Sequence, residues 1–278
     1  MQPPEIFDRA ARRRQRDRAA PDFAAHDFLR AAMLDGIHDR LGAVKRDFAA
    51  VLDLGCFDGG FVPPPGARAA RIDPGFAFAR GAGGVQGDED RLPFADGAFD
   101  LVVAAGTLDT VDDLPGALTL ARRVLRPDGL FLGAFVGGSS LSTLRRVLRE
   151  AEAERPVARL HPMVDVRAAG DLLVRAGFAL PVADVETMTV RYRDVAKLFA
   201  DLRGTGEGNV LAERHPMPRT TLARAAAGFA ALADADGRVP ERFDLVFLTG
   251  WSPSPDQPQP ARRGSAKASL ASALKPQP

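Results

Sequence analysis

The stretch VLDLGCFDGG, residues 51–60, decides the fold. It starts as a short apolar run and ends in a glycine-rich turn, which is typical of a buried parallel strand followed by a tight turn. Gly55 and Gly59 allow a positive φ and a close approach of the backbone to a ligand. In open α/β sheets, ligands lie at the carboxyl ends of the strands. The turn therefore predicts one wall of a binding site, although such a turn alone is weak evidence.

The segments around this stretch alternate between strand and helix periodicity. Short apolar runs are separated by amphipathic segments, a pattern that predicts βαβ units and a parallel sheet covered on both faces. We expect strands at 49–55, 69–73, 84–87, 99–105, 130–135, 185–192 and 243–250, and helices within 5–48 and at 114–125, 140–154, 166–176 and roughly 194–233.

The composition indicates an ordinary globular protein. Of its 278 residues, 46% are hydrophobic and 26% charged, which favours one large α/β domain. A net charge of +1 is not the strongly basic charge that is typical of nucleic-acid-binding proteins, so we expect no nucleic-acid partner. The single cysteine, Cys56, excludes an internal disulfide and a multi-cysteine metal site. We expect no metal, no membrane span and a cytoplasmic location, since long apolar runs and a secretory pattern are lacking.

Acidic residues follow the next two predicted strands. Asp73 ends the second strand, 20 residues after Asp53, where a carboxylate can accept hydrogen bonds from both hydroxyls of a ribose. A helix cap or turn before Pro74 is the alternative interpretation. Asp88 follows the third strand, where it can accept the exocyclic amine of adenine. Taken alone, this acidic loop is equally well explained as a solvated surface.

Together these motifs resemble those of class I S-adenosylmethionine (SAM)-dependent methyltransferases. The resemblance rests on LDLG (52–55), Asp73, GD (87–88) with LPF (92–94), FDLVV (99–103) and RPDG (126–129). Within that superfamily the chain resembles the malonyl-carrier-protein methyltransferases of biotin synthesis. It is more similar still to the mitochondrial complex I assembly factors described as arginine hydroxylases, and to their bacterial relatives.

The closer resemblance rests on motifs outside the cofactor core and covers nearly the whole chain. These are IFDR (6–9), VDDLPGAL (111–118), DLRGTGEGN (201–209), and GW (250–251) followed by RGSA (263–266).

The resemblance implies a Rossmann-like fold with a seven-stranded, mostly parallel sheet, helices on both faces and a helical insertion before the last strand. Its divisions would be an N-terminal helical cap (1–48), the SAM-binding core (49–136), and the C-terminal part of the sheet with a helical lid (137–251, lid about 194–233). A Pro/Ser/Ala-rich tail (252–278), in part disordered, would follow.

The same resemblance assigns the site residues. SAM would be held by Asp53, Leu54, Gly55, Phe57 and Gly59 on the methionine side, by Asp73 at the ribose, and by Asp88 and Glu89 at the adenine. Asp109, after the fourth strand, and Tyr192, at the end of a later strand, are the candidate catalytic residues on the acceptor side. For Tyr192, a buried and hydrogen-bonded structural role is an equal alternative.

The chain departs from the family pattern at three places. Phe57 stands where relatives have a glycine; a positive φ there would cost on the order of 1–2 kcal/mol, and the ring would crowd the cofactor. Asp109-Thr110 replaces a His-Trp pair. The segment 60–67 is short and proline-rich where a helix is expected.

Two further interpretations concern the turn and the N-terminus. We interpret Cys56 as a small buried residue rather than a nucleophile, because no histidine is near in sequence. The basic run 12–14 is interpreted as a solvated helix face.

Three functions remain open from the sequence. The first is a methyltransferase acting on a small molecule, a carrier protein or another protein. The second is an arginine hydroxylase or assembly factor whose partner is a complex I subunit. The third is a non-catalytic assembly or binding protein with a degenerate SAM site.

Overall fold

The computed structural model describes residues 5–257. Its centre is a seven-stranded sheet in the order β3-β2-β1-β4-β5-β7-β6, in which only β7 runs antiparallel to its neighbours. The strands are β1 (Ala50–Leu54), β2 (Arg68–Asp73), β3 (Val85–Gln86), β4 (Phe99–Ala105), β5 (Leu125–Gly137), β6 (Ala179–Tyr192) and β7 (Val239–Trp251). This confirms the predicted Rossmann-like fold.

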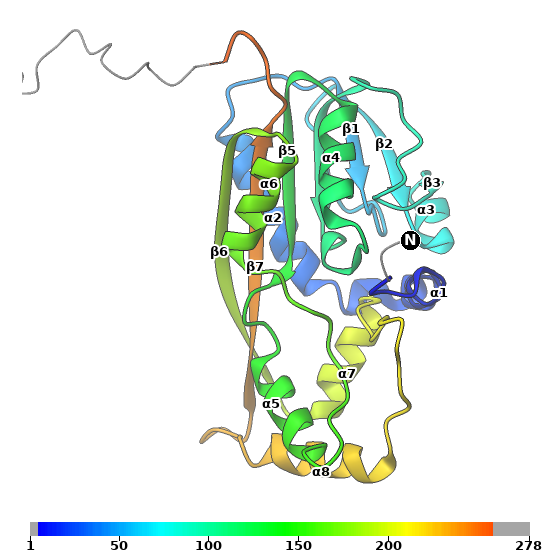
Figure 1. The fold of residues 1–278 in the computed structure, drawn as a ribbon, viewed down its shortest axis with the longest axis vertical. Helices are drawn as coiled ribbons and strands as arrows, with labels where there is room; N and C mark the ends of the chain where they lie inside the picture. The colour runs from blue at the N-terminus through cyan, green and yellow to red at the C-terminus, as the bar shows by residue number, and fades with distance from the viewer. Residues whose placement is uncertain (1–4, 258–278) are drawn as a thin grey trace, which may run out of the picture.

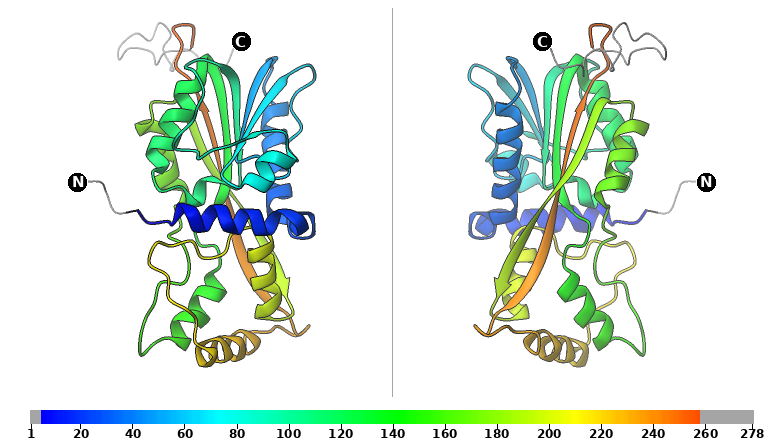
Figure 2. Two further views of the ribbon diagram at one scale, coloured as in Figure 1. Left: turned by 90° about the vertical axis from the view of Figure 1, so that its right-hand side faces the viewer. Right: turned by 90° about the vertical axis from the view of Figure 1, so that its left-hand side faces the viewer.

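Helices cover both faces of the sheet (Figures 1 and 2). Apolar residues of α4 and α6 pack on one face, and those of α2 pack on the other. The helices are α1 (Arg9–Ala19), α2 (Phe28–Gly42), α3 (Phe76–Gly81), α4 (Leu114–Val124), α5 (Ser142–Ala151), α6 (Val166–Arg175), α7 (Val195–Gly204) and α8 (Arg219–Ala230), with short 3₁₀ turns η1 (Ala20–Ala25) and η2 (Leu108–Thr110).

A second layer is built on the far ends of β6 and β7. These two strands extend beyond the parallel strands, and α5, α7 and α8 pack around the extension (Figure 1). Both α7 and α8 belong to the insertion between β6 and β7, as predicted for 194–233, but the segment 205–218 between them is not helical.

The N-terminal helix α1 lies across the junction between the sheet and this second layer (Figure 2). Its N-cap, Asp8, accepts a hydrogen bond from the Ala11 amide, which satisfies one of the free donors of the first turn. The carboxyl ends of the parallel strands therefore face α1 and not open solvent.

Strand bounds differ from the prediction where polar residues or bulges interrupt the apolar pattern. β4 matches 99–105, because its residues are buried on both faces. β5 begins at Leu125 and not at residue 130, and Asp128 within it takes a φ of 62°. No helix forms in the proline-rich segment 60–67, as its composition suggested. The predicted tail beyond residue 257, with the RGSA motif at 263–266, lies outside the described residues.

Candidate functional site

The turn after β1 has the backbone conformation that its glycines predicted. Gly55 and Gly59 have φ values of 70° and 80°. A Cβ added to Gly55 would overlap with the Thr107 side chain, so only glycine fits there. The amides of Gly55 and Cys56 both donate to the carbonyl of Ile72, at 2.8 and 3.0 Å. The turn after β1 is thus fixed against β2.

Asp73 connects this turn to the one after β2. Its side chain is fully buried; Oδ1 accepts from the Gly75 amide at 2.7 Å, and Oδ2 accepts from the Phe57 amide at 3.0 Å. Burial raises the pKa of Asp73, opposed by the nearby charge of Arg16 and by these two hydrogen bonds. The carboxylate predicted to bind a ribose therefore stands at the junction of the two turns.

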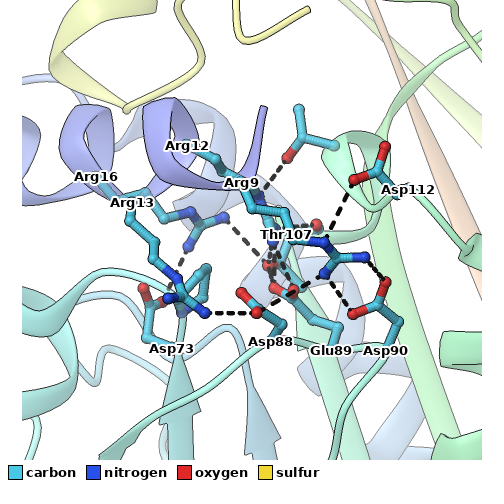
Figure 3. Close-up of polar contacts among 12 residues, drawn as sticks. Arg9, Arg12, Arg13, Arg16, Asp73, Asp88, Glu89, Asp90, Thr107 and Asp112 are labelled. Carbon is cyan, nitrogen blue, oxygen red and sulfur yellow. Dashed lines mark hydrogen bonds and ion pairs between the residues drawn. The ribbon is translucent and has the colours of Figure 1, made fainter. Parts of the chain in front are cut away.

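The remaining predicted acids lie beside it in the loop after β3. Asp88 and Glu89 are 4% and 1% exposed, so the alternative of a solvated acidic loop is wrong. Figure 3 shows Asp73, Asp88, Glu89 and Asp90 facing the underside of α1. We call these four residues the acidic row.

Arginines of α1 face the acidic row. They stand at positions 9, 12, 13 and 16, the spacing that places side chains on one helix face. The run 12–14 is therefore not the solvated face that its sequence suggested, since Arg12 is 5% exposed and only Arg14 of the three points to solvent.

Each member of the acidic row has an arginine partner (Figure 3). Arg12 and Glu89 form a bidentate pair of 2.6 and 2.9 Å, which is the strongest geometry available to these groups. The other pairs are Arg16–Asp73 at 2.9 Å, Arg13–Asp88 at 2.6 Å and Arg9–Asp90 at 2.7 Å.

Phe57 occupies the space beside this arginine face. It takes a left-handed φ of 48°, so the predicted backbone strain is present. Its ring stacks on Phe23 at 5.1 Å between centroids, and the guanidinium of Arg16 lies 4.0 Å above it. The ring is 2% exposed. It therefore packs under the N-terminal segment.

Asp53 and Leu54, at the end of β1, are buried within the sheet. Both carboxylate oxygens of Asp53 lack a hydrogen-bond partner, and Oδ2 lies 3.6 Å from Arg71 Nε. Burial raises the pKa of Asp53 to about 6, against the lowering effect of Arg30 and Arg71. Cys56 is buried, as predicted, and burial raises the pKa of its thiol.

A small cavity lies beside Phe57 and Gly106 and extends to the helical insertion. It has a volume of about 60 Å³, and its polar lining residues are Arg30, Asp109, His161, Thr205 and Glu207. Asp109, the predicted acceptor-side residue, lies next to Glu207 in this lining. Burial and the charge of Asp109 raise the pKa of Glu207 well above its ordinary value.

The sequence prediction did not identify Glu207. The available signal was an acidic residue flanked by glycines in the run 204–208. Tyr192, in contrast, does not line the cavity; it is 3% exposed and packs in the core with Val195 and Leu198. Burial raises the pKa of its hydroxyl. A catalytic role for Tyr192 stays a prediction that no contact in this structure supports.

The described residues, 5–257, bear on metal binding and on membrane spanning. No group of three or more His, Cys, Asp or Glu side chains in this part of the chain has an arrangement suited to a metal ion. Its helices are too short or too polar to cross a bilayer.

Comparisons with known proteins agree with this architecture. A methyltransferase-domain family model matches residues 52–133. The protein named arginine-hydroxylase NDUFAF5, mitochondrial, from Danio rerio is 35% identical, over 96% of this chain and 88% of the relative. The human protein of the same name is 34% identical, over 95% and 82%. A malonyl-[acyl-carrier protein] O-methyltransferase from Methylovorus is 30% identical, over 89% and 90%.

Solved structures support the fold. A putative methyltransferase from Bacillus halodurans has a TM-score of 0.56 and 16% identity, over 80% of this chain and 99% of that one. The YcgJ protein of Bacillus subtilis has a TM-score of 0.55 and 14% identity, over 79% and 99%.

Proposed function

The chain belongs to the class I methyltransferase family that contains NDUFAF5 and the malonyl-carrier-protein O-methyltransferases, and we propose that it binds SAM at the ends of β1 and β2 and transfers its methyl group. SAM is the cofactor of this family. The observation that carries the proposal is Asp73, a buried carboxylate that joins the turn after β1 to the turn after β2. In open α/β sheets this edge is where ligands bind.

The residues at this edge fit SAM by their chemistry. Asp73 would accept the ribose hydroxyls, and Asp88 with Glu89 would lie at the adenine. The turn from Asp53 to Gly59, with Leu54 and Phe57, would hold the methionine part, because its positive φ values bring the backbone close to a ligand. The residue types at this edge therefore suit SAM. In the present arrangement two of the carboxylates are paired with Arg12 and Arg16 of α1, so SAM binding requires the space that these arginines occupy.

SAM supplies a methyl group that is already activated for transfer, so the chain needs to align the acceptor and exclude water. The cavity beside Phe57 and Gly106 suits this task, because its lining is mainly apolar. Asp109 and Glu207 are its two carboxyls, and the raised pKa of Glu207 favours its neutral form. Asp109 would hold a hydrogen of the acceptor, and Glu207 would keep that carboxylate in place.

The names of the relatives point to two different acceptors. The relative from Methylovorus acts by its name on a malonyl-carrier protein, and the NDUFAF5 proteins are named arginine hydroxylases. A second candidate function is therefore the modification of an arginine on a complex I subunit. It is favoured by the higher identity to NDUFAF5 and by the Asp109–Glu207 pair, because two adjacent carboxyls suit a guanidinium group.

The two functions differ in the atoms added to the acceptor. Purified chain and SAM would be incubated with malonyl-loaded carrier protein, or with complex I subunits from a deletion strain. Dioxygen and a two-electron reductant would be present in both assays, because hydroxylation places one oxygen atom of dioxygen on the arginine and releases the other as water. Mass spectrometry would then follow each acceptor and the formation of S-adenosylhomocysteine. Methyl transfer predicts a gain of one methylene in step with S-adenosylhomocysteine. A gain of one oxygen without it would establish the second candidate and overturn the first.

A matched pair of variants links the product to the cavity. Asp109→Asn should lower the rate by at least about tenfold, since it removes a charge-assisted contact to the acceptor. Asp96→Asn, at an exposed site outside the cavity lining, should keep the rate within about twofold. Equal rates for both variants would show that Asp109 has no part in the reaction.

A further inference from the structure

The segment 5–25, which we call the N-terminal arm, comprises the first described residues, α1 and η1. Its arginine face lies on the same carboxylates that the proposed SAM site requires. Arg16 is 1% exposed over fully buried Asp73, and Arg12 is 5% exposed over Glu89, which is 1% exposed. The arm thus fills the positions assigned to the nucleoside with its own cations (Figure 3).

The chain is shaped to seat this arm from the opposite side as well. The glycines of the run 204–208 lie close to the arm and to His26, which follows it, and side chains at two of these positions would overlap with these residues. A Cβ at Gly204 would meet the ring of His26, one at Gly208 would meet Gln15, and one at Gly206 would lie 3.4 Å from Arg16 Cγ. The glycines of this motif therefore make room for the N-terminal arm.

The arm and a nucleoside cannot share Asp73. A carboxylate has about four acceptor positions, and three are used by the amides of Phe57 and Gly75 and by Arg16 Nη1. A Cβ added to Gly75 would lie 2.8 Å from Arg16 Cβ, so the arginine also fills the space next to the turn. The adjoining cavity of about 60 Å³ is well below the roughly 300 Å³ of the smallest usual ligand sites.

The arm can leave without opening the core. Neither of the two large apolar clusters contains a residue of the arm; their first member along the chain is Leu29, in α2. The arm's own apolar contacts are small and peripheral: Phe7 and Ala11 with Val210 and Leu211, and Ala19 and Phe23 with two phenylalanines. Its ion pairs with Asp73 and Glu89 are buried, so the arm leaves only when a ligand or water takes the place of the arginines at these carboxylates.

We propose that the N-terminal arm is an internal competitor of SAM, which occupies the cofactor site through Arg12 and Arg16 and must be displaced before the cofactor binds. This inference rests on the proposed function, because it assumes that the acidic row holds SAM. The measured affinity for SAM is then the intrinsic affinity reduced by the fraction of molecules with the arm open.

Hydrogen exchange of the full chain, with and without SAM, tests the displacement directly. Exchange of the amides at 9–19 should become faster when SAM binds, while exchange at 51–60 should become slower. If SAM instead slows exchange at 9–19, the arm closes over the cofactor and the proposal is wrong, although the proposed function stands.

Calorimetric titration with SAM tests the competition through the arginines. The double variant R12Q/R16Q should bind SAM at least about tenfold more tightly than the wild type, or about 1.4 kcal/mol. R14Q/R18Q, which removes the same charge from the exposed side of the same helix, should match the wild type. Circular dichroism would confirm that both variants are folded.

The titration separates the two claims. Equal affinity of the wild type and R12Q/R16Q refutes the competition and leaves the cofactor site in place. Absence of binding in both, up to millimolar SAM, refutes the proposed function as well, because removing the arginines then exposes no cofactor site.

Discussion

Arg16 and Asp73 form an ion pair of 2.9 Å in which neither side chain is more than 1% exposed, and the pair joins the first helix to the end of β2. Placing two charges in the interior is costly, and that cost is recovered only when both partners are present. The pair therefore favours the conformation in which α1 lies at this edge of the sheet. The same carboxylate is the strongest candidate for the ribose of SAM.

A double-mutant cycle measures this dependence. Arg16→Gln should lower the free energy of unfolding by about 3 kcal/mol, because Asp73 stays buried without its cation. If the arm instead opens locally and exposes Asp73 to water, the loss equals the smaller free energy of that local opening. In an Asp73→Asn background the same substitution should cost at least about 1 kcal/mol less. Urea unfolding of the four proteins provides the values. Strict additivity would show that the two groups do not interact.

Substitutions at Phe57 test the left-handed backbone. Phe57→Ala and Phe57→Gly both remove the ring, so both should destabilise the chain. Gly should be more stable than Ala by about 1 kcal/mol, the reverse of the usual order, because φ at this position is 48°. Guanidinium unfolding of the two variants measures the difference. A more stable alanine variant would mean that the backbone relaxes out of this region.

The buried carboxylate of Asp53 predicts a pH dependence of stability. Its pKa is raised from 3.8 to about 6, so the folded state binds the proton more tightly than the unfolded state. The stability contributed by the neutral form is complete below the unfolded pKa and is lost as the pH rises through about 6. Asp53→Asn carries no such charge and should stabilise the chain more at pH 7.5 than at pH 5, by about 1 kcal/mol.

Thermal unfolding of Asp53→Asn and the wild type at both pH values measures this effect. Asp96→Asn, on an exposed side chain, controls for the general loss of one negative charge. A stabilisation that is the same at both pH values would show that Asp53 does not titrate in this range.

Glu207 predicts a second pH effect, at the acceptor cavity. Burial and neighbouring Asp109 raise its pKa well above 4.5, so its contribution to stability is present at low pH and lost as the pH rises through the raised pKa. Glu207→Gln keeps a donor towards Asp109 but cannot ionise. Its melting temperature relative to the wild type should therefore increase between pH 5 and pH 8. Glu213→Gln, at an exposed site, is the matched control; a constant difference for Glu207→Gln would contradict the pairing.

The sequence predicted the sheet well where strands are buried on both faces. β4 is apolar apart from Asp100 and was placed at its observed bounds. The outer strands are longer than predicted for local reasons. β6 includes Leu180, with a φ of 49°, and has runs of consecutive exposed residues, whereas β7 begins with a Val-Pro-Glu-Arg segment that is typical of a turn.

The sequence predicted the carboxylates of the candidate site but not the arginines that face them. Asp73, Asp88 and Glu89 follow predicted strands, so the parallel topology alone brings them together. Their partners Arg12 and Arg16 are at least 57 residues away in sequence. Their spacing shows a common helix face, but it carries no information on what that face contacts. For the same reason Glu207, on the insertion, was not identified.

On the proposed competition, SAM and the arginines of α1 bind one set of carboxylates in turn. A crystal structure of the full chain with SAM should show ribose hydroxyls hydrogen-bonded to Asp73, with Arg16 and Arg12 withdrawn from Asp73 and Glu89. SAM bound elsewhere, or bound at this edge with both arginines still on their carboxylates, would contradict it.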